Sequence, residues 1–554
     1  MSDSKPEPPS AGPVAVIPSS AGPAQRPMAK AALLLSLATL ASRILGLLRE
    51  QVFAALLGAG YYGDAFTMAF RLPNLLRDLF AEGALSAAFQ PTFIETRKKS
   101  GPDSAFALAN AVTTLLVIVV GTLVLFGTIF APQLVDTWAA GYAQIAGKAE
   151  LTVLLTRIMM PFLLLVSVAA VAMGMLNSEQ RFLPPALAPA LFNLSAIVVG
   201  GTLWVLGIGR TRTAVIAWAA ATMIGGLLQL LAQWLPLFRS GYRVRLGTMF
   251  SHPGLRPMLW AMAPATIGLA ATQVNIYVSS SFASQQDGAV TWLQVAFRLM
   301  QLPIGMFGVA IGTVALAQAA DSASESDLRT ALDGVRDTMR RGLRLTTFYT
   351  LPTAVTLWVL AEPILRVIYQ HGAFTASDTE HAAAALRYYS IGLLCYSGIK
   401  VVAPVFYALQ RARIPMLASL LAVLCGVLWN IVFHKSFGYL ALALGTTITA
   451  SVNFGVLLLS FRRRYGTLLR EGDGKALFQI AVLSGLSGVV MSGTVWVYKT
   501  ATGHGTLATS TVGTIALLAA ALLLGGLTYV GLGKLAKLAE VEEVLAVLNR
   551  RLRR

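Results

Sequence analysis

Charged residues are scarce in this sequence. Only 12% of its 554 residues are Asp, Glu, Lys or Arg, whereas 56% are hydrophobic, and the mean hydropathy is +0.68. Soluble domains carry about a quarter charged residues, so this composition excludes an ordinary soluble fold. Apolar runs such as residues 110–131 reach the length of about 20 residues that a helix needs to cross a bilayer. The chain is therefore predicted to be an all-α polytopic membrane protein.

Cysteine and histidine are also rare, with two and five copies. Cys395 and Cys425 lie in apolar segments without CxxC spacing, and the histidines are scattered without ligand spacing. We therefore expect no metal site and no cofactor. The sequence also has no paired, motif-placed carboxylates at a membrane face and no nucleophile elbow, which argues against an enzyme.

About fourteen apolar segments are predicted to span the membrane. They cover 29–58, 62–94, 105–131, 150–176, 183–207, 213–238, 254–283, 288–319, 343–368, 380–408, 414–434, 438–461, 475–498 and 507–533. Lys and Arg concentrate in one set of alternate loops and in both termini. The other loops hold only Lys148, Arg210, Arg212, Lys435 and Lys499. The positive-inside rule then predicts that both termini are cytoplasmic. It also accounts for most of the net charge of +18 without a nucleic-acid partner.

The chain contains an internal repeat. "AFRL" occurs at 69–72 and 296–299, and "QRFLPPALAPAL" (180–191) matches "QRARIPMLASLL" (410–421) at six positions; "LGLLREQV" (45–52) weakly matches "IGLAATQV" (267–274). The similar offsets indicate duplication of a six-helix unit. Because six is even, the copies share one orientation, as in transporters with parallel repeats. The predicted architecture is two six-helix lobes around a central cavity, with two further helices at the C-terminal end.

These observations divide the chain into five predicted parts. They are a disordered cytoplasmic tail (1–27), a first lobe (28–240), a second lobe (241–464), a C-terminal helix pair (465–533) and a basic amphipathic cytoplasmic tail (534–554).

Several charged residues fall inside the predicted spans. An Arg or Lys at mid-bilayer costs about 2.5–3.5 kcal/mol, so such residues should face water or partners in a polar cavity between the lobes. The acids would form ion pairs with these bases or control the opening of the cavity. For Glu50 and Asp64, the alternative is an ion pair with no further role. Surplus guanidinium groups favour an anionic, phosphorylated substrate. Arg157 has no evident role beyond a structural one. The predicted substrate-binding residues are Arg43, Arg49, Arg71, Asn74, Arg77, Arg298 and Lys400; the predicted gating or pairing acids are Glu50, Asp64, Asp78 and Glu82.

Residues 41–93, from "ASRILGLLREQV" to "AAFQPTF", closely resemble the signature of the MviN/MurJ family. Residues 296–317 and 369–410 are similar to it as well. These bacterial lipid II flippases belong to the multidrug/oligosaccharidyl-lipid/polysaccharide exporter superfamily. The resemblance implies an inner-membrane protein that uses alternating access. Its implied substrate is the undecaprenyl-diphosphate-linked disaccharide-pentapeptide of peptidoglycan synthesis, with the last two helices forming a groove for the lipid tail.

The same resemblance implies roles for individual residues. The family's cavity positions correspond to Arg43, Arg49, Asp64, Arg77, Glu82, Arg298 and Lys400, with diphosphate binding by the arginines and gating or pairing by the acids. The family commonly has an acid just before the second-lobe arginine, where this chain has Phe297. The implied driving force is the membrane potential or a cation gradient, although no sodium cage is evident. Cell-wall synthesis enzymes are possible partners.

Other candidate functions predict different features of the sequence. A drug or cation exporter of the same superfamily should have a cavity dominated by acids. An exporter of another polyprenyl-linked glycan is disfavoured only by the family-specific block at 41–93. A scaffold that recruits cell-wall enzymes would need loops large enough to form domains, whereas the longest internal loop has about 24 residues.

Overall fold

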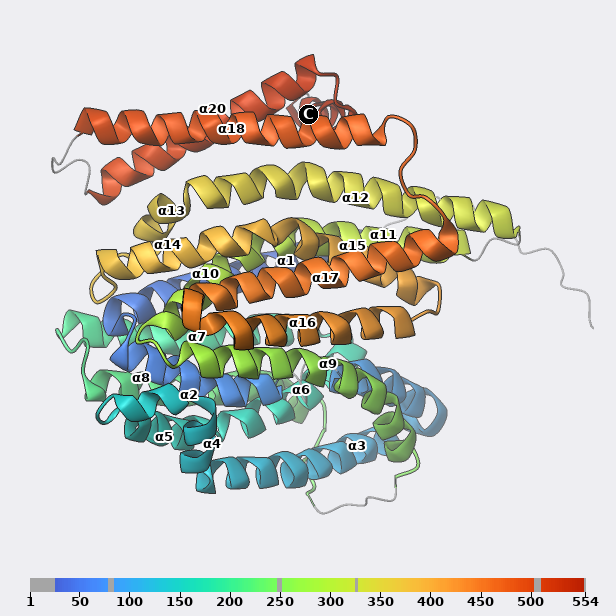
Figure 1. The fold of residues 1–554 in the computed structure, drawn as a ribbon. Coiled ribbons are helices and arrows are strands. Elements are labelled where there is room, and N and C mark those ends of the chain that lie inside the picture. The colour runs from blue at the N-terminus through green and yellow to red at the C-terminus, as the bar shows by residue number, and fades with distance from the viewer. Residues whose placement is uncertain (1–24, 78–83, 247–251, 324–326, 503–509, 553–554) are drawn as a thin grey trace, which may run out of the picture.

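The computed structural model describes residues 25–77, 84–246, 252–323, 327–502 and 510–552. Over these ranges the chain is helical and contains no strand. Long helices run roughly side by side across the molecule (Figure 1). The predicted 1–27 tail lies mostly outside the described residues, because the first helix begins at Gln25.

The first lobe contains eight α-helices and a short 3₁₀ turn. They are α1 (Gln25–Leu57), α2 (Tyr61–Arg77), α3 (Ala84–Ile129), α4 (Ala131–Trp138), η2 (Ala140–Gln144), α5 (Lys148–Met159), α6 (Phe162–Ser178), α7 (Leu183–Val205) and α8 (Arg212–Arg239). Helix α3 changes direction at Gly101, whose φ of 82° lies in the left-handed region that glycine tolerates.

The second lobe repeats this order and includes one π-helical turn. Its elements are α9 (Leu255–Ala283), α10 (Ala289–Pro303), η3 (Ile304–Val309), α11 (Ala310–Ala323), α12 (Leu328–Val359), α13 (Ala361–Tyr369), α14 (Ala376–Ile391), α15 (Leu393–Ala408), α16 (Arg413–Phe437) and α17 (Tyr439–Tyr465). The chain continues with α18 (Asp473–Thr502), α20 (Thr511–Leu535) and α21 (Ala539–Leu552). Helices α18 and α20 form an outer layer beside α12, at the top of Figure 1.

The predicted spans are confirmed as helices. Within the described ranges, nine helices are long and apolar enough to cross a membrane, or eleven if two bent pairs are counted as spans. The bent pairs are α12 with α13 (75°) and α14 with α15 (44°). The other predicted segments correspond to α1, to α2 with the start of α3, and to α9. Large apolar side chains such as Val205, Val512 and Leu535 are exposed on the outside, as expected where lipid is the solvent.

The duplication extends to the contacts between helices. Helix α2 packs on α5 as α10 packs on α14, and the pair α7–α8 matches α16–α17. The connections before α7 and α16 also share a backbone feature, since Gln180 and Gln410 have φ values of 59° and 56°. These two glutamines are 230 positions apart, which is the offset of the second sequence match.

The same 230-residue offset relates Arg157 to Arg387, and the two side chains make the same kind of contact. Nε of Arg157 donates to the carbonyl of Thr128 at 3.2 Å, near the end of α3, and Arg387 donates from Nε to the carbonyl of Trp358 at 3.4 Å, near the end of α12. The last carbonyls of a helix have no partner within the helix, so each arginine supplies a missing donor. This contact is consistent with a structural role for Arg157.

We expect Arg157→Met and Arg387→Met each to lower the free energy of unfolding by about 1 kcal/mol, because each removes one partly exposed capping bond. The two sites share no partner, so the double variant should lose the sum of the two effects. Thermal unfolding in detergent measures both values. A loss above about 3 kcal/mol from Arg157→Met alone would contradict a capping role.

Candidate functional site

Glu50 lies at the centre of a charged cluster between the lobes. Its Oε1 is 2.5 Å from Nη2 of Arg298 on α10 and 3.3 Å from Nη2 of Arg49, its neighbour on α1. The hydroxyl of Tyr369, from α13, donates to the other carboxylate oxygen at 3.4 Å. One carboxylate therefore serves two guanidinium groups, and the cluster keeps a surplus positive charge. The side chain of Arg298 is 45% exposed, so this guanidinium is open to a further partner.

The remaining residues predicted to bind substrate lie in different environments. Arg71 donates to the hydroxyl of Ser280 on α9 and has no carboxylate partner among the described residues. Arg43 on α1 and Lys400 on α15 are exposed. Asn74 and Arg77 are half-buried near the end of α2. The predicted acids Asp78 and Glu82 lie outside the described residues.

Phe297 does not leave Arg298 without an acid. Its ring packs against Tyr389 and Tyr396, at centroid distances of 5.4 and 6.4 Å. The acid that pairs with Arg298 is Glu50 from the other lobe. The ion pair therefore crosses the interface between the lobes instead of lying within α10.

Asp64 belongs to a second cluster, in which Asp64 and Lys148 are fully buried and Asp287 is 54% exposed. Oδ2 of Asp64 lies 3.2 Å from Nζ of Lys148, and neither side chain is exposed. Lys148 also lies 2.5 Å from Oδ1 of Asp287, in the connection between α9 and α10. The Asp64 carboxylate accepts hydrogen bonds from the backbone N–H groups of Gly288 (2.7 Å) and Thr291 (3.0 Å). It also accepts one from the Thr291 hydroxyl, at 2.7 Å. The start of α2 is thus bonded to the start of α10 across the lobes.

This second cluster lies at the end of the bundle where the connecting loops carry few Lys or Arg residues, which we call the base-poor end. Further contacts join the lobes there. The N–H of Ala373 donates to the carbonyl of Ala55 at 2.7 Å, and Nη2 of Arg210 donates to the carbonyl of Ala373 at 2.5 Å. A Cβ on Gly58 would lie 2.6 Å from the Ala373 carbonyl oxygen. The close approach therefore requires glycine.

Lys148 and Asp287 were missed by the sequence analysis. The sequence places Lys148 in a loop between two apolar segments, yet it is fully buried at the first residue of α5. The only signal in the sequence was the acid Asp64, which needed a counter-charge if buried. Nothing in the sequence placed Asp287 beside it.

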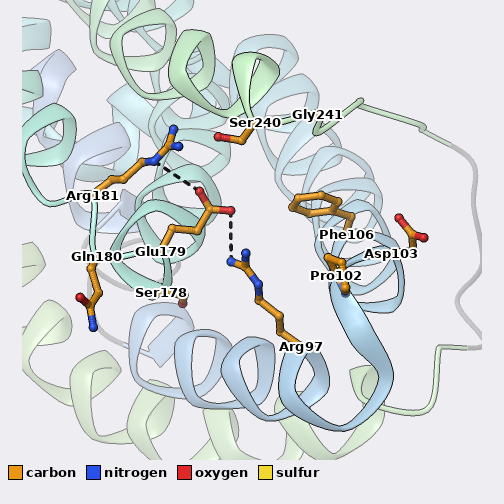
Figure 2. Close-up of a pocket in the computed structure, with 10 residues that line it drawn as sticks. All are labelled: Arg97, Pro102, Asp103, Phe106, Ser178, Glu179, Gln180, Arg181, Ser240 and Gly241. Atoms are coloured by element: carbon orange, nitrogen blue, oxygen red, sulfur yellow. Dashed lines mark hydrogen bonds and ion pairs between the residues drawn. The ribbon is translucent and has the colours of Figure 1, made fainter.

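A separate hollow of about 770 Å³ lies at the opposite, base-rich end of the first lobe (Figure 2). Its walls come from the bend in α3, the connection between α6 and α7, and the end of α8. Glu179 pairs with Arg97 at 3.2 Å and with Arg181 at 3.7 Å on one side of it. Because its acids and bases balance, this hollow lacks the positive surplus found around Glu50. In the described part of the chain, no three His, Cys, Asp or Glu residues are grouped as metal ligands.

The fold is similar to that of solved membrane transporters of two kinds. It is similar to an inward-facing MATE family transporter of the MOP superfamily, with a TM-score of 0.60 and 14% identity over 77% of this chain and 95% of that one. It is more similar to a solved "Lipid II flippase MurJ, inward closed conformation", with a TM-score of 0.74 and 24% identity over 91% of this chain and 99% of that one.

Within that class, sequence comparison defines the family. The family model described as "Lipid II flippase MurJ" matches residues 53–524. A lipid II flippase MurJ from Burkholderia cenocepacia is 35% identical over 77% of this chain and 82% of its own length. A probable lipid II flippase MurJ from Vibrio cholerae is 33% identical over 84% and 88%. The chain belongs to the MurJ family, as its resemblance at 41–93 predicted. It is a multi-span membrane protein, and this family implies the bacterial inner membrane.

Proposed function

We propose that this protein moves lipid II from the inner to the outer leaflet of the bacterial inner membrane. The observation that carries the proposal is the pairing of Arg49 and Arg298 with a single carboxylate, Glu50, between the lobes. A diphosphate carries more than one negative charge, and guanidinium groups bind phosphate through two parallel hydrogen bonds. The surplus positive charge of this cluster suits such a headgroup, and Arg43, Arg71, Arg77 and Lys400 on α1, α2 and α15 are the further candidate cations. Family membership supports the same substrate.

The conformation fits one step of an alternating-access cycle. Cross-lobe contacts around Asp64 and Ala373 close the base-poor end. With both termini in the cytoplasm, as the positive-inside rule predicts, this end faces outward, and the structure corresponds to a state closed to the outside. The proposal also includes two lobes, with limits near residues 240 and 464. It further includes a site for the lipid tail on the pair α18–α20.

A drug or cation exporter is the competing function, since the MATE fold is similar. An acid-rich site would favour it, but among the described residues the Glu50 cluster contains two arginines and one acid. The proposed coupling to membrane potential or a cation gradient rests on the resemblance alone.

Reconstitution of the purified protein tests the proposal. Proteoliposomes should move lipid II between leaflets faster than protein-free vesicles, and faster than they move other polyprenyl-diphosphate sugars. An imposed membrane potential of either sign then tests the coupling. Equal rates for all polyprenyl-diphosphate sugars would indicate a general glycolipid flippase that is not specific for lipid II. No movement of any of them would refute the flippase function.

A further inference from the structure

A charged cluster at the base-rich end joins three helices that the proposed substrate site does not use. Arg344 on α12 donates from Nη1 to Oδ1 of Asp473, the first residue of α18, at 2.9 Å, and its Nη2 lies 2.6 Å from Oε1 of Glu540 on α21. Arg340, one turn earlier on α12, donates to Oδ2 of Asp473 at 3.2 Å. We call Arg340, Arg344, Asp473 and Glu540 the α12 clamp.

The clamp is largely shielded from water. The side chains of Asp473 and Glu540 are only 1% and 6% exposed. The apolar residues Phe348, Ile480 and Val541 are buried beside it, and the hydroxyl of Tyr529 on α20 donates to the carbonyl of Phe348 at 2.9 Å. Charge pairs at low exposure are screened less than surface pairs, and breaking one leaves a buried charge without compensation. The clamp therefore differs from an ordinary surface salt bridge.

The position of the clamp explains why these helices need it. Helices α18 and α20 form the outermost layer of the molecule (Figure 1). Their main packing onto the lobes is that of α18 on α12 and of α20 on α13. Because α12 carries most of this attachment, its side chains decide whether the outer pair follows the second lobe.

The internal repeat provides a comparison within the same molecule. At the 230-residue offset, Arg340 corresponds to Asn110, Arg344 to Thr114 and Asp473 to Arg243. These three first-lobe positions include no acid and so form no ion pair with one another: Nδ2 of Asn110 donates to the carbonyl of Arg243 at 3.1 Å, and Thr114 bonds within its own helix. Among these matched positions, the ion pairs are found where the second lobe meets the two extra helices.

We propose that Arg344 is a positioning residue that joins α18, α20 and α21 to the second lobe as one rigid body. The outer helix pair then moves with that lobe when the lobes rock, and a lipid tail held by the pair keeps a fixed distance from the headgroup cations of the same lobe. This inference rests on the proposed function for the motion it describes. It adds the C-terminal helix α21, through Glu540, to the moving unit.

Distances between spin labels in the full-length protein test this proposal, with Cys395 and Cys425 replaced by serine. One label pair, at Arg329 on α12 and Lys475 on α18, reports on the clamp. A second pair, at Arg329 and Lys99 on α3, reports on the movement between lobes. The variants are Arg344→Ala, Arg344→Lys and Glu540→Gln. Arg341→Ala is the matched control, because Arg341 is exposed on the same turn of α12 and belongs to no ion pair among the described residues.

In the parent protein, the lobe pair should change distance between conformational states, whereas the clamp pair should keep one narrow distribution. Arg344→Ala and Glu540→Gln should broaden the clamp distribution and slow lipid II movement about fivefold or more. Arg344→Lys should recover part of the rate, and Arg341→Ala should leave both readouts unchanged.

Two results would overturn the inference: a clamp distance that shifts together with the lobe distance in the parent protein, or an Arg344→Ala variant with a narrow distribution and the parent rate. A parent protein that moves no lipid II would refute the proposed function instead. The label distances would still decide whether the clamp holds.

Discussion

Replacement of Lys148 with methionine is expected to open the base-poor end of the molecule. The change keeps most of the side-chain volume but leaves the buried carboxylate of Asp64 without its cation, and removes the bond to Asp287. Removing one partner of a buried ion pair costs about 3–5 kcal/mol. Because Asp64 and Asp287 come from different lobes, this cost falls on the state in which the lobes are closed together.

Two measurements check this expectation. Thermal unfolding should show a lower midpoint than that of the parent protein. Spin labels on the two lobes should show the closed population reduced or lost. Lys435→Met is the matched control, because Lys435 is exposed at the same end of the bundle. If Lys148→Met matches this control in both measurements, the cluster of Asp64, Lys148 and Asp287 does not hold the lobes together.

Replacement of Arg298 with alanine is expected to abolish most of the transport without unfolding the protein. The side chain is 45% exposed and shares Glu50 with Arg49, so its removal leaves Glu50 paired. A hydrogen bond to a charged group contributes about 1.5–3 kcal/mol, which corresponds to roughly 10- to 100-fold weaker binding of a diphosphate. A strain depleted of its own flippase should therefore not grow on Arg298→Ala, although membrane levels of the protein stay normal.

Arg298→Lys separates charge from geometry. Partial growth would indicate that attraction dominates, whereas complete loss would indicate bidentate contact. Arg413→Ala is the control, since Arg413 is exposed at the start of α16. Full growth of Arg298→Ala would remove Arg298 from the substrate site and leave it a role in pairing only.

Much of the fold could be predicted because the membrane imposes simple rules. Backbone groups in lipid must bond within helices, so each long apolar run had to become a helix. The repeat was readable because "AFRL" and the Gln-Arg motif occupy turns and packed positions in both copies. The breaks within spans, such as the 75° bend between α12 and α13, were not predicted, because a bent helix pair and a straight span have the same hydropathy.

The candidate site was predicted in part for a similar reason. Charges within apolar spans are conspicuous, so the sequence alone indicates Glu50, Asp64 and Arg298 as candidate site residues. Lys148 and Asp287 lie in or next to loops in the sequence, where charges are ordinary, and only the folded chain buries Lys148 and brings Asp287 to it. The Glu50–Arg298 pair joins residues from different lobes, and no spacing along the chain could predict it.

The bond between Asp64 and Thr291 carries a consequence for how the two halves diverged. These residues are 227 positions apart, the offset of the "AFRL" match, so they are counterparts in the duplicated units. The two copies share one orientation and are related by an approximate twofold axis. Counterparts that touch must lie close to this axis. In a molecule assembled from two identical first halves, two aspartates would face each other there in a dry interface. Each aspartate would bring its own Lys148, so such an ancestor would crowd two carboxylates and two ammonium groups at the axis, whereas Thr291 in place of the second aspartate leaves a single carboxylate there.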